Sequence, residues 1–111
     1  MKIATILPYK ENYTFSKAQA AAIWVSDFYR LSKFKKNTYI YGSTNTKDYL
    51  TKNYINIDLN NLKTKFTSTT KEYCDNFIKK TSNKNFDIVE IHNRPEVFNL
   101  LKTHFKSKFV L

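Results

Sequence analysis

Short apolar runs alternate with longer mixed segments along this chain. Residues 2–7 (KIATIL) are apolar and β-branched, and Pro8 follows them, which predicts a strand buried on both faces. Residues 37–41 (NTYIY) predict a second strand that ends at Gly42 and a turn of Ser, Thr and Asn. Further strands are predicted at residues 54–59 (YINIDL), 86–91 (FDIVEI) and 108–111 (KFVL).

Three segments with helical periodicity separate these strands. The first is predicted to begin at a Ser16 cap and to run to about Lys33. Its apolar stripe follows spacings of three, four and three residues and consists of Ala21, Trp24, Phe28 and Leu31. The second helix is predicted over residues 60–80, and the third from Pro95, a residue that the first turn of a helix tolerates.

The resulting order of elements is β-α-β-β-α-β-α-β. Strands that alternate with helices favour a parallel sheet covered on both faces, and 111 residues fit one modest domain. We therefore predict an α/β fold, a single Rossmann-like three-layer domain over residues 1–111 with a parallel sheet of about five strands.

The apolar residues 109–111 stand at the carboxyl terminus, although a central parallel strand normally leads into a loop or helix. Two explanations are open. The chain is one piece of something longer, by truncation or by gene splitting, or it ends in a short edge strand. We favour the first, in which the domain is incomplete at its carboxyl end.

Composition excludes several classes of site. The one glycine excludes a Walker A loop and a standard dinucleotide fingerprint. Cys74 is the only cysteine, so no disulfide forms within the chain, as suits a reducing cytosol. We expect Cys74 to be a small apolar filler in a helix, because no histidine or second cysteine stands at metal-ligand spacing from it.

The formal charge is +10, from 19 basic and 9 acidic residues. Such a charge attracts nucleic acid, an anionic membrane surface or a phosphorylated substrate. The basic residues are nearly all scattered lysines, however, so we favour a solvated basic surface over a dedicated polyanion site. No stacking motif of a nucleic-acid-binding module is present, and we expect no nucleic-acid partner.

Candidate ligand-binding residues follow two of the predicted strands. Ligands of open parallel sheets bind beyond the carboxyl ends of the strands. Two loops are predicted to lie there, residues 8–16 and residues 92–94 (HNR), and the second precedes a helix whose N-terminus favours an anion. The candidates are Tyr9, Lys10, His92, Asn93 and Arg94.

These residues also have plainer structural roles. Asn93 suits a helix cap, Arg94 a solvated first turn, and His92 a bond to a backbone carbonyl. His104, on an apolar helix face, is expected to be a packed histidine. No nucleophile and base stand at a diagnostic spacing, so we predict no catalytic residue and no metal ligand.

The opening MKIATILP, the Ala-rich helix and the segment FDIVEIHNRPEVFNLL together resemble the amino-terminal domain of family 4-like glycosyltransferases of the GT-B type. The most specific match is H-N-R-P at residues 92–95, after a strand of the family's form, and the likeness covers essentially all 111 residues. One departure is the loop YKENYTFSKAQA, which has none of the glycines common in the family there.

The resemblance implies half of a GT-B fold. In the whole enzyme this half would hold a saccharide or lipid-linked acceptor, with Tyr9, Lys10 and residues 92–94 as acceptor-binding residues. A carboxyl-terminal domain would bind the nucleotide-sugar donor and supply catalysis, so this chain would be inactive alone and would need no cofactor. Such an enzyme would act in polysaccharide biosynthesis in the cytoplasm, where a basic surface suits peripheral contact with the anionic inner face of the membrane.

Two alternatives remain. The chain can be a stand-alone basic Rossmann-like binding module for a phosphorylated ligand or polyanion, in which case the +10 charge is the functional feature. A response-regulator-like or flavodoxin-like domain would need acidic residues or a phosphate loop after the first strand. Residues 9–11 (YKE) supply neither.

Overall fold

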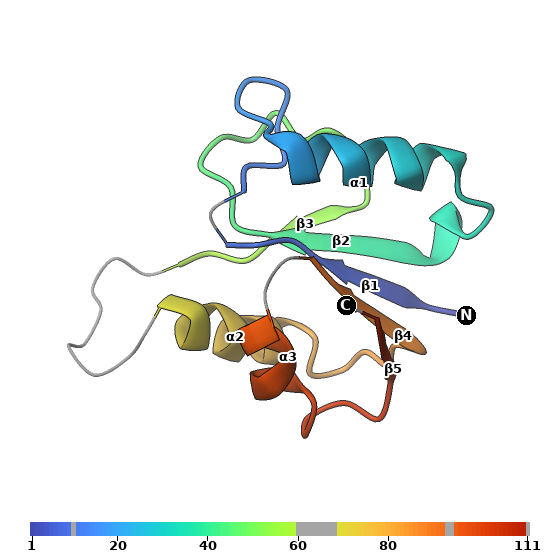
Figure 1. Ribbon diagram of the computed structural model, residues 1–111, viewed down its shortest axis with the longest axis vertical. Helices are drawn as coiled ribbons and strands as arrows, with labels where there is room; N and C mark the ends of the chain where they lie inside the picture. The colour runs from blue at the N-terminus through green and yellow to red at the C-terminus, as the bar shows by residue number, and fades with distance from the viewer. Residues whose placement is uncertain (10, 60–68, 93–94, 111) are drawn as a thin grey trace.

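The computed structural model of the protein describes residues 1–9, 11–59, 69–92 and 95–110 (Figure 1). Its strands are β1 (Ile3–Ile6), β2 (Thr38–Gly42), β3 (Tyr54–Asn56), β4 (Ile88–Ile91) and β5 (Lys108–Val110). Its helices are α1 (Ala20–Leu31), α2 (Thr69–Lys80), α3 (Pro95–Leu101) and the short 3-10 helix η1 (Lys35–Asn37).

The five strands form one sheet in the order β3-β2-β1-β4-β5, and every neighbouring pair is parallel. Helix α1 lies on one side of the sheet, and α2 and α3 lie on the other, which makes three layers (Figure 1). The predicted α/β, Rossmann-like fold with a parallel sheet is therefore confirmed.

Alternation along the strands divides the core between the two faces of the sheet. Ala4 and Ile6 of β1 belong to the larger apolar cluster, which includes Tyr73 and Phe77 of α2 and Cys74, the expected apolar filler. Leu7 belongs instead to a smaller cluster beneath α1. Each face of the sheet thus has its own apolar core, as a parallel sheet covered by helices requires.

Two expectations for the first helix are wrong. Helix α1 begins at Ala20 rather than after a Ser16 cap, and Ser16 is held by a distant loop, where its N–H donates to the carboxylate of Asp48 at 2.8 Å. The predicted apolar stripe does not face the core, since Ala22, Val25 and Ser26 are the buried residues of α1.

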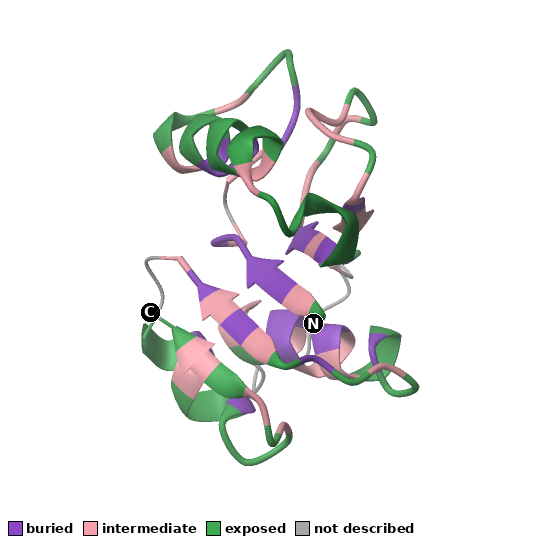
Figure 2. Cartoon of the chain, turned by 90° about the vertical axis from the view of Figure 1, so that its right-hand side faces the viewer, coloured by how far each residue is buried: buried purple, intermediate pink, exposed green. Residues whose placement is uncertain are grey.

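The neighbours of α1 explain why its smaller residues face inward. The stacked rings of Tyr13 and Tyr54, with centroids 5.1 Å apart, belong to the same apolar cluster as Ala22 and Val25. These rings occupy part of the space beneath the helix, so small side chains fit there, and Trp24, Phe28 and Leu31 are more than half exposed. A cavity of about 100 Å³, which Trp24 and Phe28 help to line, remains between α1 and the sheet. Much of α1 is accordingly coloured as exposed in Figure 2.

The later elements follow the predictions with shorter bounds. Helix α2 covers the second half of the predicted helix, and residues 60–68 lie outside the described part. Helix α3 begins at Pro95 as expected, but it ends at Leu101, so His104 follows it and is exposed rather than packed.

Candidate functional site

The loops after β1 and β4 lie at the same edge of the sheet. The Leu7 N–H donates to the Tyr41 carbonyl at 2.9 Å, and the His92 N–H donates to the Ile6 carbonyl at 3.0 Å. These bonds continue the parallel ladders past the strand ends, so Pro8 and His92 leave the sheet together. Among the five candidates, Tyr9 and His92 are described and lie at this carboxyl edge, whereas Lys10, Asn93 and Arg94 are outside the described residues.

His92 is paired with a carboxylate. Its Nε2 lies 2.8 Å from Glu90 Oε1, and the two side chains are 17% and 29% exposed. Because Glu90 and His92 are two residues apart, both side chains point to the α1 side of the sheet, where the Trp24 ring lies 5.6 Å from the imidazole. This pairing holds the imidazole of His92 at its Nε2.

A polar pocket lies beyond the carboxyl ends of β1, β2 and β3. Its volume is about 490 Å³, and it is lined by Tyr9, Asn12, Ser43, Thr44, Asn45, Asn56, Asp58 and Leu59. Of the two candidates that the structure describes, Tyr9 lines this pocket and His92 does not. The remaining lining comes from Asn12 in the loop after β1, from the loop after β2, and from Asn56 at the end of β3 with the residues that follow it. The pocket thus lies at the carboxyl edge of the sheet, the edge at which open parallel sheets bind ligands.

Asn56 at the end of β3 holds the polar pocket together. Its Oδ1 accepts the Thr44 N–H at 2.8 Å and the Tyr54 hydroxyl at 3.0 Å, while its Nδ2 donates to Asp58 Oδ1 at 2.8 Å. The Lys80 ammonium also donates to the Asn56 carbonyl at 2.8 Å. These bonds tie three segments into one wall, so the pocket is already organised before any ligand binds.

Beneath this wall, Gly42 and Tyr54 pack closely. A Cβ on Gly42 would lie 2.9 Å from the Tyr54 hydroxyl oxygen, a distance that real Cβ contacts essentially never show. Burial raises the pKa of Tyr54, so its hydroxyl stays protonated and able to donate to Asn56. The only glycine of the chain therefore leaves room for the ring that supports the polar pocket.

Tyr9 is held against α2. Its ring centroid lies 6.1 Å from that of Tyr73, whose hydroxyl donates to the Leu7 carbonyl at 2.6 Å. Tyr73 is fully buried, and its pKa is well above the usual value because of that burial. The start of the loop after β1 is thus anchored, and this positions the Tyr9 ring beside the polar pocket.

The chemistry of the polar pocket suits a hydroxylated ligand. Its described lining offers side-chain amides, hydroxyls, one carboxylate and an aromatic ring, and contains no lysine or arginine. These groups donate and accept hydrogen bonds in both directions, as sugar hydroxyls require. An adjoining cavity of about 430 Å³ shares Thr44, Asn45, Asn56 and Asp58 and adds Lys47 and Lys80.

Sequence reasoning missed most of this lining. It identified Ser43, Thr44 and Asn45 only as a turn and Asn56 only as a strand residue, and it extended the third strand beyond Asn56 over Asp58. The rule that ligands bind beyond parallel strand ends applies to β2 and β3 as well as to β1 and β4, so these polar residues carried a usable signal.

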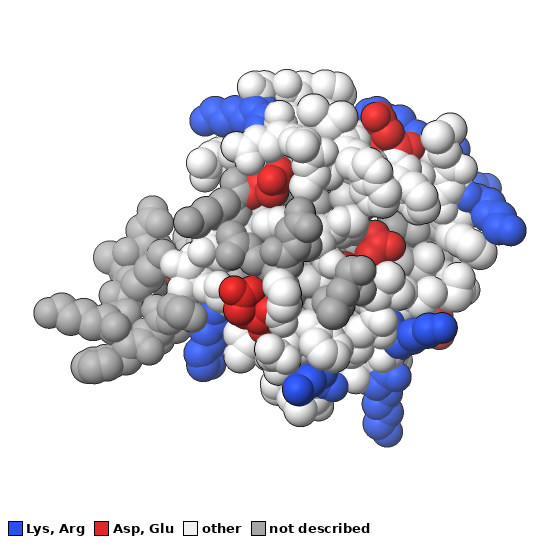
Figure 3. Space-filling model, viewed as in Figure 1, with Lys and Arg blue, Asp and Glu red and all other residues white. Residues whose placement is uncertain are grey.

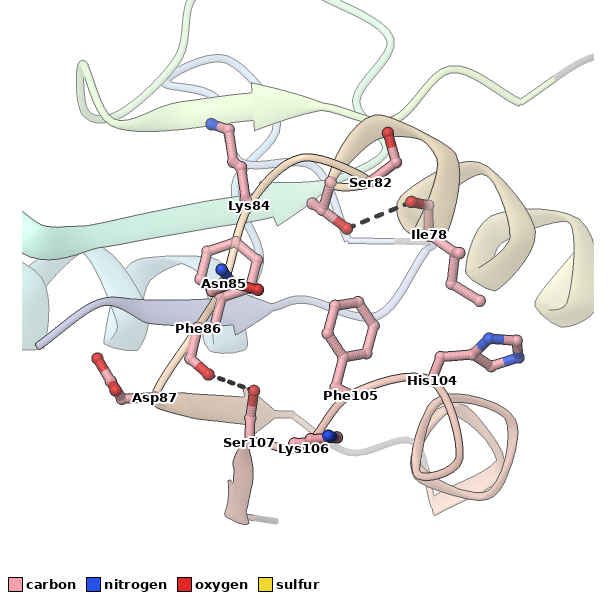
Figure 4. Close-up of a pocket in the computed structure, with 11 residues that line it drawn as sticks. Ile78, Ser82, Lys84, Asn85, Phe86, Asp87, His104, Phe105, Lys106 and Ser107 are labelled. Atoms are coloured by element: carbon pink, nitrogen blue, oxygen red, sulfur yellow. Dashed lines mark hydrogen bonds between the residues drawn. The ribbon is translucent and has the colours of Figure 1, made fainter.

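A larger cavity of about 790 Å³ lies at the opposite edge, between the loops that lead into β4 and β5 (Figure 4). Phe86 and Phe105 border it, and the Ser107 hydroxyl donates to the Phe86 carbonyl. In Figure 4 the His104 ring lies to one side of the Phe105 ring, close to the end of α3. Although this cavity is larger, we do not take it as the candidate ligand site, because it lies at the amino ends of the strands.

Comparisons with known proteins leave the family open: no family model, no curated protein and no solved structure matches this chain. Within the described ranges, no helix has the length and apolar character needed to cross a membrane. Nor do three or more His, Cys, Asp or Glu residues of those ranges gather in a group able to hold a metal ion.

Proposed function

We propose that this chain is the acceptor-side domain of a GT-B glycosyltransferase, which transfers a sugar from a nucleotide-sugar donor to a saccharide or lipid-linked acceptor in the cytoplasm. The H-N-R-P match at residues 92–95 suggests the family, and the parallel Rossmann-like sheet is the fold that such a domain needs. The donor would bind to a second, carboxyl-terminal domain. This chain would then bind acceptor but be inactive without that partner domain.

The observation that carries the proposal is the polar pocket. It lies at the carboxyl edge of the sheet, its described lining is rich in amide and hydroxyl groups, and Tyr9 presents a ring beside it. Sugars are bound by this combination of paired hydrogen-bonding groups and an aromatic face. His92 is held by Glu90 at the same edge. We assign it as a second contact, for an acceptor that extends from the pocket towards β4.

Binding of saccharides to variants of the lining tests the proposal. Tyr9→Ala and Asn45→Ala each remove a lining group, whereas Asn85→Ala, at the opposite edge, is the matched control. Calorimetry with a panel of methyl glycosides and disaccharides should find a ligand whose Kd rises roughly 3- to 10-fold in the first two variants, because one hydrogen bond contributes about 1 kcal/mol. Equal affinity in all three variants would refute the assignment of the pocket.

The charge of +10 favours a second candidate, a stand-alone basic module for a phosphorylated ligand or polyanion. Lys47 and Lys80 border the cavity beside the polar pocket, although Figure 3 shows the basic side chains that are visible in its view spread around the periphery of the molecule. Binding of a polyphosphate that weakens steeply with added salt, and that Lys47→Gln reduces, would favour this module over acceptor binding.

A further inference from the structure

Helix α1 carries apolar side chains on its exposed side as well as on its packed side, and two of them, Trp24 and Phe28, also line a cavity of about 100 Å³ between α1 and the sheet. Only two of its residues are charged, and they pair with each other, with Arg30 Nη1 3.7 Å from Asp27 Oδ1. Several large apolar side chains exposed along one helix normally mark a surface that something else covers. The exposed apolar side chains are Ile23, Trp24, Phe28 and Leu31, at 49%, 55%, 57% and 89% exposure.

The apolar surface continues beyond both ends of the helix. Phe15 is 69% exposed on the loop before α1, which adjoins the amino end of the helix in Figure 1 and Figure 2. Phe34 is 39% exposed on the turn that follows. We call the set of Phe15, Ile23, Trp24, Phe28, Leu31 and Phe34 the α1 face.

Positive charge borders the α1 face. Residues 15–37 contain five basic residues and one acidic residue, and the acidic one, Asp27, is already paired with Arg30. The four remaining cations are all exposed; they are Lys17, Lys33, Lys35 and Lys36. This charge opposes docking against an identical face, and it attracts a negatively charged apolar surface.

We propose that the α1 face docks the protein on an anionic membrane surface, with α1 lying in the plane of the lipid headgroups. Helices that bind in this way combine exposed aromatic and aliphatic side chains with flanking lysines, and they do not span the bilayer. The inference rests on the α1 face alone, so it holds or fails separately from acceptor binding. For the proposed enzyme, it places the chain at the membrane that supplies a lipid-linked acceptor.

Trp24 reports directly on this docking, because it is the only tryptophan of the chain and lies within the α1 face. Mixed with vesicles of equal parts phosphatidylcholine and phosphatidylglycerol at low salt, the full chain should sediment with the lipid, and the Trp24 emission should shift to shorter wavelength. Pure phosphatidylcholine vesicles, or added salt, should weaken both signals.

Charge variants distinguish the contribution of the lysines beside the α1 face from that of the net charge of the protein. The triple variant Lys33→Gln, Lys35→Gln, Lys36→Gln should bind anionic vesicles roughly 10- to 100-fold more weakly, since each lysine near the surface contributes roughly fivefold. The control variant Lys79→Gln, Lys102→Gln, Lys106→Gln removes the same charge from exposed positions on or beside α2 and α3. It should bind nearly as well as the parent chain.

Leu31→Gln tests the apolar contribution without disturbing the fold, because Leu31 is 89% exposed. We expect roughly tenfold weaker vesicle binding from this change. Equal losses in the two lysine variants, or no vesicle binding at low salt, would overturn the proposal. A dimer that Leu31→Gln dissociates in light scattering, without vesicle binding, would assign the α1 face to self-association instead.

Discussion

Replacing Gly42 with alanine tests how closely the sheet and the polar pocket are packed. The new Cβ would lie 2.9 Å from the Tyr54 hydroxyl oxygen, 3.2 Å from Tyr54 Cε1 and 3.5 Å from Leu7 Cδ1. The Tyr54 ring must therefore move, although it stacks on Tyr13 and is bonded at its hydroxyl to Thr44 at 2.9 Å and Asn56 at 3.0 Å. Its movement strains or breaks both hydrogen bonds.

The magnitude follows from these contacts. Overpacking costs roughly 1–3 kcal/mol, and two weakened hydrogen bonds add about 1 kcal/mol each. The loss of chain entropy in the unfolded state offsets up to about 1 kcal/mol. We therefore expect Gly42→Ala to lower the free energy of unfolding by roughly 2–5 kcal/mol, a large part of the 5–15 kcal/mol that is usual for a domain.

A double-mutant cycle isolates the cause. Tyr54→Phe alone should cost about 1–2 kcal/mol, because Asn56 keeps its bond from the Thr44 N–H. In the double variant, Gly42→Ala with Tyr54→Phe, the shortest clash is gone. Its loss of stability should therefore be about 1–2 kcal/mol smaller than the sum of the losses in the two single variants. Urea unfolding followed by circular dichroism measures all four free energies. A stable Gly42→Ala variant, or costs that add fully, would refute this packing argument.

Three further results are expected. Tyr73→Phe should destabilise the chain by about 1–2 kcal/mol in urea unfolding, since the Leu7 carbonyl loses its buried donor; an unchanged midpoint would contradict this bond. Asn56→Ala should cost roughly 1–3 kcal/mol and also abolish any saccharide binding, and binding that survives would separate the ligand from the polar pocket. Burial raises the pKa of Cys74 to about 11 and that of Tyr41 to about 12, so the folded chain holds these protons where the unfolded chain has begun to lose them. Stability should consequently fall as pH rises above about 9, with Cys74→Ala delaying the onset, whereas stability that is flat to pH 11 would contradict the shift.

The sheet could be predicted from the sequence because its signal is local. The apolar run of residues 2–7 ends at Pro8, and that of residues 86–91 ends at the polar tripeptide 92–94. Helices that alternate with strands favour parallel pairing. The same reasoning placed His92 correctly at the edge that Pro8 occupies, since parallel strands end together.

The orientation of α1 could not be predicted because it depends on distant residues. Periodicity showed an apolar stripe, but it could not show that the rings of Tyr13 and Tyr54 already occupy the space beneath the helix. The segment before α1 is also held by a distant residue, since the Asp48 carboxylate accepts the Ser16 N–H.

The lining of the polar pocket could not be predicted for the same reason. Asn56 reads as one more residue of a strand, and its importance comes from Thr44 and Asp58, which the fold brings to its side chain. An asparagine that joins three segments has no local sequence pattern. Tyr9 could be identified because its position next to Pro8, at the end of the first apolar run, is sufficient to place it at the carboxyl edge.

The most direct test of acceptor binding is a map of the ligand on the folded chain. Titration of the ¹⁵N-labelled protein with methyl glycosides and disaccharides should produce saturable amide shifts at Tyr9, Asn12, residues 43–45 and residues 56–58. The opposite edge, at residues 82–87 and 104–107, should stay unchanged. Shifts confined to that opposite edge, or shifts with inorganic phosphate but with no saccharide, would contradict the account.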